Sequence, residues 1–337
     1  MRRALLVLAA LLAAGSPAPA QDAAAFYAGR SIRLLVGVDV GSGYDVNARL
    51  LARHMSAHIP GNPGFIVQNQ PGAGSATMTS QLYASGPFDG TVIGAAFAGM
   101  PTLPLLQPGG SRFDPTKLIW LGNTNRETHV TYVWHTAPVQ SLAAARMSEL
   151  ILGAQAPGSS QIDFPLVADA LLGFKFKIVS GYQSTSKINL ALESGEVQGT
   201  IAAWTTLKTL SAAWLADHKI KIIAQWALRP NPELSDIPNV LDVANTDAER
   251  DALRLVMARL DVGRPFFLPP NVPPDRVAAL RAAFDATMKD PDYLAEADKL
   301  KIDVDPLTGA ELAALVTQVS QTPTETVARV RAALERR

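Results

Sequence analysis

The folded part of the chain opens with one local pattern that occurs twice: a mainly apolar run, a glycine-rich turn and a helix-like run. In the first copy, residues 32–38 precede Gly-Ser-Gly-Tyr-Asp at 41–45, and in the second, residues 65–67 precede Asn-Gln-Pro-Gly-Ala-Gly at 69–74. Short strands that alternate with helices are typical of an α/β fold, a mostly parallel sheet flanked by helices. Because crossovers between parallel strands are right-handed, we expect both turns at the same edge of the sheet.

These turns are predicted ligand sites. The first amides of a helix have no partner within the helix and lie at the positive end of its dipole, so they attract carboxylate or phosphate. A third turn of small residues follows the strand predicted at 150–154. Aromatic side chains at 44, 182 and 204 could form apolar walls of the site, although each could equally be a core residue. Each of the three turns could likewise be an ordinary turn without a ligand. The predicted ligand-binding residues are Gly41, Ser42, Gly43, Tyr44, Asp45, Gly72, Ala73, Gly74, Gly158, Ser159, Ser160, Tyr182 and Trp204.

Asp45 has a predicted structural role as well. An acidic side chain beside an anion site is unfavourable unless it is turned away from the ligand. As the N-cap of the helix that follows, Asp45 would direct its carboxylate onto the amides of its own helix.

The strand–turn–helix pattern returns in the middle of the chain and predicts a second α/β lobe. This lobe would comprise residues 123–225 and would be inserted into a first lobe made of residues 21–122 and 226–337. The two crossings between the lobes are expected near Gly122 and Gln225.

The last third of the chain is predicted to be helical. Proline is tolerated in the first turn of a helix, so Pro274 and Pro291 each mark a start. Thr308 with Glu311 three residues later matches a capping box, which marks a third start.

The first twenty residues have the features of a signal peptide. Arg2 and Arg3 precede an apolar run at 4–14, and Ala-Pro-Ala at 18–20 matches a cleavage site. The run is shorter than the ~20 residues that span a bilayer. The sequence therefore predicts export to the periplasm, with Gln21 as the mature start. The chain has no cysteine and a formal net charge of zero, and so we expect neither disulfides nor nucleic-acid binding.

Motifs for catalysis are incomplete. The chain has no Gly-x-Ser-x-Gly elbow and no P-loop, and Val46 and Thr77 stand where a dinucleotide fingerprint needs its last glycine or alanine. His54 and His58 are spaced for one helix face but have no third metal ligand at motif spacing. Without a paired acid and base, the sequence predicts a protein that is not an enzyme and that uses no cofactor or metal.

The order of the motifs resembles the Bug-type receptors, the extracytoplasmic solute-binding proteins of tripartite tricarboxylate transporters. The resemblance extends from about residue 26 to the C-terminus. The motifs that carry it are at 41–45, 69–74, 88–92, 192–197, 237–240 and 267–273.

The resemblance implies a two-lobed, periplasmic-binding-protein-like ("Venus flytrap") fold without catalysis. It implies that a small organic acid lies between the lobes, held largely by backbone amides and small hydroxyls at 41–44 and 158–160, with 72–74 as a neighbouring loop. The closed receptor would be presented to a membrane permease, and we expect a monomer.

Three residues depart from the family pattern. Ser42 stands where the family usually has glycine, Tyr44 where a small residue is common, and Ser75 where glycine is frequent. Together with Trp204, Tyr44 suggests a bulkier or aromatic acid. Two alternatives stay open: a ligand-sensing subunit of a signalling system, and a periplasmic enzyme that acts on an organic acid. Arg126 and Arg229, near the predicted hinge, could reach the ligand or lie on the surface.

Overall fold

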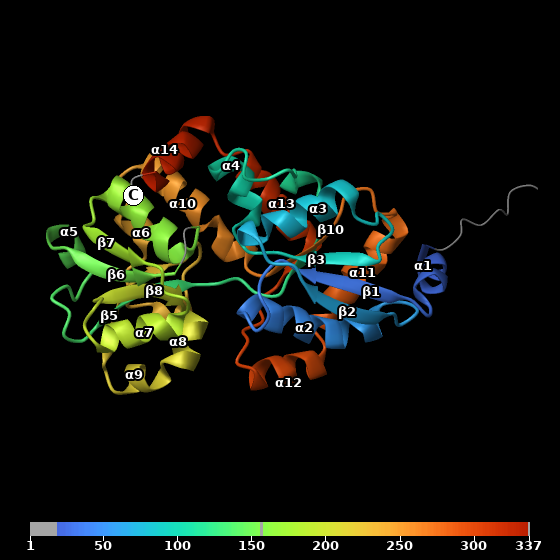
Figure 1. Cartoon of the computed structure of the whole chain (residues 1–337), viewed down its shortest axis with the longest axis horizontal. Helices are drawn as coiled ribbons and strands as arrows, with labels where there is room; N and C mark the ends of the chain where they lie inside the picture. Colours follow the sequence, from blue (N-terminus) through green and yellow to red (C-terminus); the bar gives the residue numbers. More distant parts are fainter. Residues whose placement is uncertain (1–18, 156–157, 336–337) are drawn as a thin grey trace, which may run out of the picture.

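The computed structural model describes residues 19–155 and 158–335. They form two lobes side by side, each with a β-sheet between layers of helices (Figure 1). The predicted fold class, a two-lobed α/β protein, is confirmed. Residues 1–18 of the predicted signal peptide lie outside the described residues.

The first lobe contains a mixed sheet with strand order β11-β4-β10-β3-β1-β2. β1 runs parallel to β2 and β3, whereas β10 is antiparallel to β3 and β4. The antiparallel strand follows from the chain path, because β10 enters this lobe at the edge where β1 and β3 end. The strands are β1 (Ser31–Val36), β2 (Gly64–Asn69), β3 (Val92–Ala95), β4 (Ile119–Asn123), β10 (Pro265–Leu268) and β11 (Leu307–Thr308).

Helices cover both faces of this sheet, because successive side chains of a strand point to opposite faces. In β10, Phe266 packs into the core under α2 and α11, and Phe267 into the core under α3 and α13. The helices of the first lobe are α1 (Pro19–Tyr27), α2 (Gly43–Met55), α3 (Ala76–Ser85), α4 (Leu103–Leu106), α11 (Pro274–Thr287), α12 (Pro291–Lys299) and α13 (Gly309–Ser320).

The second lobe contains a sheet with strand order β7-β6-β8-β5-β9. β6 is parallel to β7 and β8, and β5 is antiparallel to β8 and β9. Its strands are β5 (His129–Trp134), β6 (Leu150–Ala154), β7 (Phe176–Ser180), β8 (Gly199–Ala203) and β9 (Ile220–Trp226). Its helices are α5 (Ala144–Met147), α6 (Ser160–Leu172), α7 (Thr185–Glu193), α8 (Trp204–Leu210), α9 (Ala212–Ala216), α10 (Asp247–Val262) and α14 (Thr324–Leu334).

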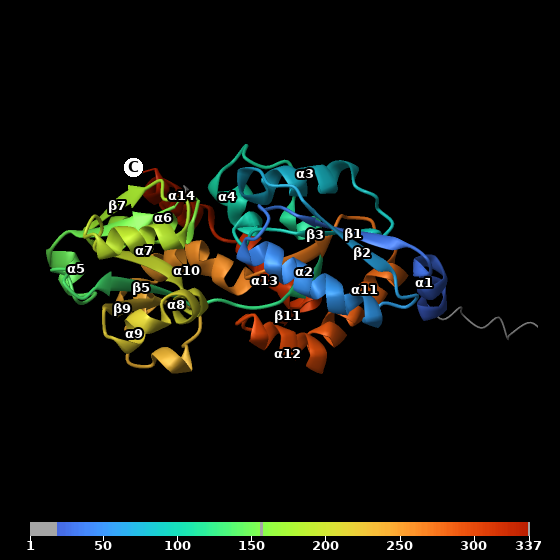
Figure 2. The same cartoon turned by 60° about the horizontal axis from the view of Figure 1, so that its bottom comes forward.

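The C-terminal segment is shared between the lobes, whereas the sequence-based division places all of 226–337 in the first. After β9 the chain stays with the second lobe through α10, whose Leu253 and Val256 lie in one core with Phe164 and Trp226. α14 returns to that core after α13, as Figure 2 shows. α10 stays with the second lobe because it has an apolar stripe, which α6 and α14 bury.

The chain therefore crosses between the lobes three times, at 124–128, at 263–264 and, between α13 and α14, at 321–323. The first two crossing segments are adjacent. The Thr124 N–H donates to the carbonyl of Arg264 at 3.3 Å, and the Glu127 N–H to the carbonyl of Leu260 at 2.8 Å. Gly263 has φ +57°, and a Cβ there would lie 1.8 Å from the carbonyl oxygen of Asn125. Only glycine lets the two segments lie this close together. Among the helices of the described ranges, none is long and apolar enough to cross a membrane.

Candidate functional site

A cavity of about 310 Å³ lies between the two lobes, beside the crossing segments. The first lobe contributes Gly43 and Tyr44 from the start of α2, and Phe97 from the loop after β3. The second contributes Ser159 and Ser160 from the start of α6. Two helix N-termini, one from each lobe, thus face the same space.

The first glycine loop is held by a buried carboxylate. The helix begins at Gly43, and its N-cap is Ser42, whose Oγ accepts a hydrogen bond from the Asp45 amide at 3.3 Å. The prediction that Asp45 is the cap is therefore wrong, because the helix starts earlier and places Asp45 in its first turn. Its carboxylate instead accepts from the Gly41 amide at 2.8 Å and from Arg49 and Asn69.

The charge of Asp45 is stabilised by this arrangement. Burial works to raise the pKa of Asp45, but hydrogen bonds from Arg49, Gly41 and Asn69 outweigh burial and hold the pKa below its usual value. Asp45 thus stays ionised and turned toward the loop, and it does not line the cavity.

The second glycine turn supports the first. Gly72, Ala73 and Gly74 are exposed and do not line the cavity. The next residue, Ser75, donates its hydroxyl to the Gly37 carbonyl at 3.0 Å and accepts from the Phe97 amide at 2.9 Å. The two turns are therefore neighbours at one sheet edge, and Ser75 fixes the loops after β1 and β3.

Tyr44 forms an apolar wall with Phe97, at a ring-centroid distance of 5.3 Å. Its hydroxyl accepts a hydrogen bond from the Ala98 amide at 3.2 Å, and the Arg264 guanidinium lies 5.0 Å from its ring centroid. Burial raises the pKa of Tyr44 to about 12, and the charge of Glu127 adds to the effect. Tyr44 is thus a neutral wall residue at physiological pH.

The turn at 158–160 of the second lobe offers a hydroxyl without a hydrogen-bond partner. Ser159 is the N-cap residue of α6, but its Oγ makes no cap hydrogen bond. That oxygen is buried and has no hydrogen-bond partner among residues 19–155 and 158–335. Gly158, with φ +84°, does not line the cavity; its carbonyl accepts a hydrogen bond from Arg259 at 2.8 Å.

Two arginines line the cavity, and each is paired with a carboxylate. Arg259, on α10, is only 7% exposed and bonds Asp163 at 2.7 Å. Arg264, between the lobes, bonds Glu127 at 3.0 Å. Burial works to raise the pKa of Glu127, but the charge of Arg264 and hydrogen bonds from His129 and Asn125 lower it to about 2.

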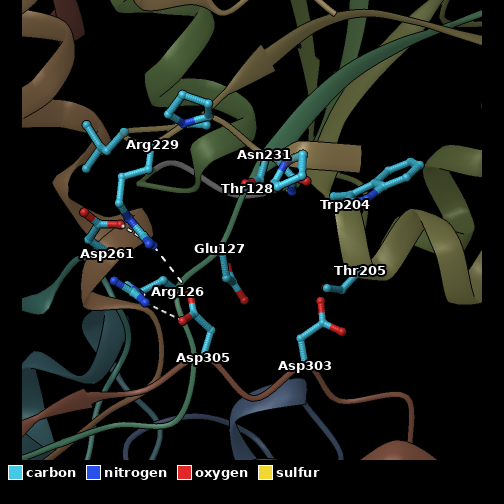
Figure 3. Close-up of a pocket in the computed structure, with 14 residues that line it drawn as sticks. Arg126, Glu127, Thr128, Trp204, Thr205, Arg229, Asn231, Asp261, Asp303 and Asp305 are labelled. Carbon is cyan, nitrogen blue, oxygen red and sulfur yellow. Dashed lines mark hydrogen bonds and ion pairs between the residues drawn. The ribbon is translucent and has the colours of Figure 1, made fainter. Parts of the chain in front are cut away.

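A second, smaller pocket of about 210 Å³ lies beside the first crossing segment, and Glu127 lines both this pocket and the larger cavity (Figure 3). It contains Trp204, which donates its indole N–H to Glu233 at 2.6 Å. Arg126 pairs there with Asp305, and Arg229 lies 3.5 Å from both Asp261 and Asp305.

This hinge pocket, defined by the residues of Figure 3, is unsuited to an anion. Asp303 faces the open space opposite Thr205 without an ion pair to any described residue (Figure 3). Burial raises the pKa of Asp261, although Arg229 and Arg126 oppose the effect. Carboxylates thus outnumber the two arginines, and Arg126 and Arg229 are occupied by them. Tyr182 lines neither pocket, and its hydroxyl donates to Glu196 at 2.7 Å.

Known proteins were compared with this chain in sequence and structure. No protein-family model matches. The chain is 25% identical over 312 residues to the UPF0065 protein in the gbd 5′ region of Cupriavidus necator, covering 89% of this chain and 87% of that one. It superposes on a TctC solute-binding protein from Polaromonas with a TM-score of 0.69 and 19% identity, covering 92% of this chain and all of the other. The resemblance to the Bug-type receptors is confirmed.

Further structures support the same fold. The periplasmic binding protein BugD matches with a TM-score of 0.65 and 20% identity over 91% of this chain and 98% of its own. MatC from Rhodopseudomonas palustris, solved with bound malate, matches with a TM-score of 0.63 and 18% identity over 91% of this chain and 99% of its own. The Polaromonas protein is named as a solute-binding protein and BugD as a periplasmic binding protein.

The cavity contains residues that sequence reasoning missed. The Bug-type resemblance implies largely neutral donors, yet Arg259 and Arg264 line the space. His129 lies there too, with Nε2 3.2 Å from Glu127 and Nδ1 3.0 Å from Ser160. Glu127 and His129 are two residues apart, but the fold brings Ser160, Arg259 and Arg264 to them from distant parts of the chain, so no spacing motif covers the group. The one available signal was the charge of Arg259 among the apolar residues of the 252–262 run.

Proposed function

We propose that the chain is a periplasmic solute-binding receptor that captures a small carboxylate between its lobes and delivers it to a membrane permease of the tripartite tricarboxylate type. The observation that supports it most is the convergence of two helix N-termini, those of α2 and α6, on one cavity. Each brings unpaired amides and the positive end of a helix dipole. The buried, unpartnered Oγ of Ser159 adds a hydroxyl donor for an anion.

The charges of the cavity fit a single carboxylate better than a cation. Arg259 and Arg264 are each neutralised by an acid, but Asp163 lies behind the cavity wall while both guanidiniums line it. A ligand carboxylate therefore meets more positive than negative lining, and it does not have to break an ion pair to bind.

Binding would favour closure of the lobes. The donors of α2 belong to the first lobe and those of α6 to the second, so one ligand contacts both sets only when the lobes approach. A ligand shifts this equilibrium by its difference in affinity for the closed and open forms. The malate bound in MatC supports an organic acid as the ligand class.

A thermal-shift screen tests the receptor function. Mono-, di- and tricarboxylates, aromatic acids and acidic amino acids would be added to the mature chain, with the matching amides as uncharged controls. A ligand at a hundredfold excess over its Kd stabilises the fold by about 2.7 kcal/mol, so a clear rise in Tm is expected for an acid and not for its amide. Equal shifts for acids and amides, or none, would count against the proposal.

Delivery to a permease is tested separately. Cells that lack the gene should lose uptake of the radiolabelled acid identified in the screen, and a plasmid copy should restore it. Unchanged uptake together with a lost transcriptional response to the acid would instead favour the sensor alternative.

One observation favours a second candidate, hydrolysis of an ester of an organic acid. Ser160, His129 and Glu127 form a hydrogen-bonded series like that of serine hydrolases, although the serine lies at Nδ1 of the imidazole. Release of nitrophenol from a nitrophenyl ester, lost in Ser160→Ala, would support it. A receptor returns its ligand unchanged.

A further inference from the structure

Ser160 stands at the end of a continuous hydrogen-bond relay. Its Oγ lies 3.0 Å from His129 Nδ1, and His129 Nε2 lies 3.2 Å from Glu127 Oε2. The other oxygen of Glu127 accepts from Arg264 at 3.0 Å. The members come from α6, β5 and the crossing segments, and the His129 and Glu127 side chains are each 12% exposed.

The relay has a direction. Arg264 keeps Glu127 ionised at neutral pH, so this carboxylate can only accept hydrogen bonds. The proton between Glu127 and His129 must therefore be on Nε2. In a neutral imidazole the other nitrogen is then an acceptor, and the Ser160 hydroxyl donates to it. The oxygen of Ser160 is left with lone pairs toward the cavity that it lines.

We propose that this relay makes Ser160 a hydrogen-bond acceptor for the ligand and so selects 2-hydroxy acids, carboxylic acids with a hydroxyl on the carbon beside the carboxylate. The inference rests on the proposed function. The amides of α6 and the hydroxyl of Ser159 are donors for the carboxylate, and Ser160 is the adjacent residue. A hydroxyl one carbon from the carboxylate is placed to donate to it.

The charges of the cavity favour a hydroxyl over an ammonium group as this donor. Arg259 and Arg264 both line the space, against the single lining carboxylate of Glu127, which Arg264 already pairs. An ammonium group beside Ser160 would meet an excess of positive charge. A 2-amino acid should therefore bind more weakly than the matching 2-hydroxy acid.

Calorimetric titration at pH 8, where histidine is ordinarily neutral, tests the inference. The probes are matched sets: butanoate, 2-hydroxybutanoate and 2-aminobutanoate; succinate and malate; 3-phenylpropanoate and 3-phenyllactate. In whichever matched set fits the cavity, the 2-hydroxy acid gains one hydrogen bond. We therefore expect it to bind about three- to tenfold more tightly than the parent acid that lacks the hydroxyl. Ser160→Ala should bring this ratio to about one.

Two further variants complete the design. His129→Phe keeps a ring but removes the acceptor of the Ser160 proton, so the ratio should also fall. Ser180→Ala, the same substitution at an exposed position of the same lobe, should leave both affinities unchanged. Equal binding of parent and 2-hydroxy acids by the wild type, or a preference that survives in Ser160→Ala, would overturn the inference alone. If no acid binds at all, the proposed function falls and the inference falls with it.

Discussion

The substitution Glu127→Gln probes the ion pair that joins the two adjacent crossing segments. Glu127 lies on the first segment and Arg264 on the second, with 3.0 Å between Oε1 and Nη2. Their side chains are 12% and 16% exposed, so neither charge is well solvated. Glutamine keeps the shape of the side chain but leaves Arg264 without its counter-charge, and removal of one partner of a buried pair costs about 3–5 kcal/mol.

The pKa of Glu127 gives a second measure of this interaction. The folded pKa of about 2 lies below the ordinary glutamate pKa of 4.5, which applies to the unfolded chain. At about 1.4 kcal/mol per unit, the ionised form contributes about 3 kcal/mol to the free energy of unfolding at neutral pH. Because the folded pKa is the lower one, this contribution is present above about pH 4.5 and is lost as the pH falls toward 2, with about 1.4 kcal/mol gone at pH 3.5.

The assay is urea denaturation of the wild type and Glu127→Gln at pH 7.5, 5.5, 4.5 and 3.5. The variant should be less stable by about 3 kcal/mol at pH 7.5, and the gap should shrink by about 1.4 kcal/mol at pH 3.5. Glu149→Gln is the matched control, because Glu149 is 59% exposed and lies 3.7 Å from Lys177; an exposed pair contributes about 0–1 kcal/mol. A gap that stays constant or widens on acidification would refute the reasoning.

Three other substitutions test the framework of the site by thermal and urea denaturation. Asp45→Ala removes the acceptor of the Gly41 amide and should cost about 2–3 kcal/mol, and a variant within 0.5 kcal/mol of wild type, roughly the error of such a measurement, would contradict this role. Gly263→Ala places a Cβ 1.8 Å from the carbonyl oxygen of Asn125 and should destabilise by more than about 3 kcal/mol or prevent folding; an unchanged Tm would rule out the close contact. Thr308→Ala removes a cap and should cost about 1 kcal/mol, whereas no loss would mean that the cap contributes nothing.

Local structure was predictable where it depends on neighbouring residues. β6 begins and ends where its apolar run predicts, and Thr308 and Glu311 form both hydrogen bonds of a capping box. The start of α2 was misplaced, since Ser42 and Asp45 are both good caps, and spacing alone does not choose between them.

The content of the cavity was less predictable, because its partners are distant in sequence. Arg259 meets Asp163 across 96 residues and Arg264 meets Glu127 across 137. The packing of α10 on the second lobe decides the first of these pairs, and no local signal announces that packing. His129 has Glu127 two residues away, but its bond to Ser160 across 31 residues exists only after β5 and α6 come together.

A crystal structure of the mature chain with the acid that raises Tm most is the most direct test of the central claim. The claim predicts the ligand carboxylate in the cavity between the lobes, about 2.7–3.2 Å from the first amides of α6 and from Ser159 Oγ. A carboxylate bound instead in the hinge pocket beside Arg229, or only on an exposed surface, would contradict it.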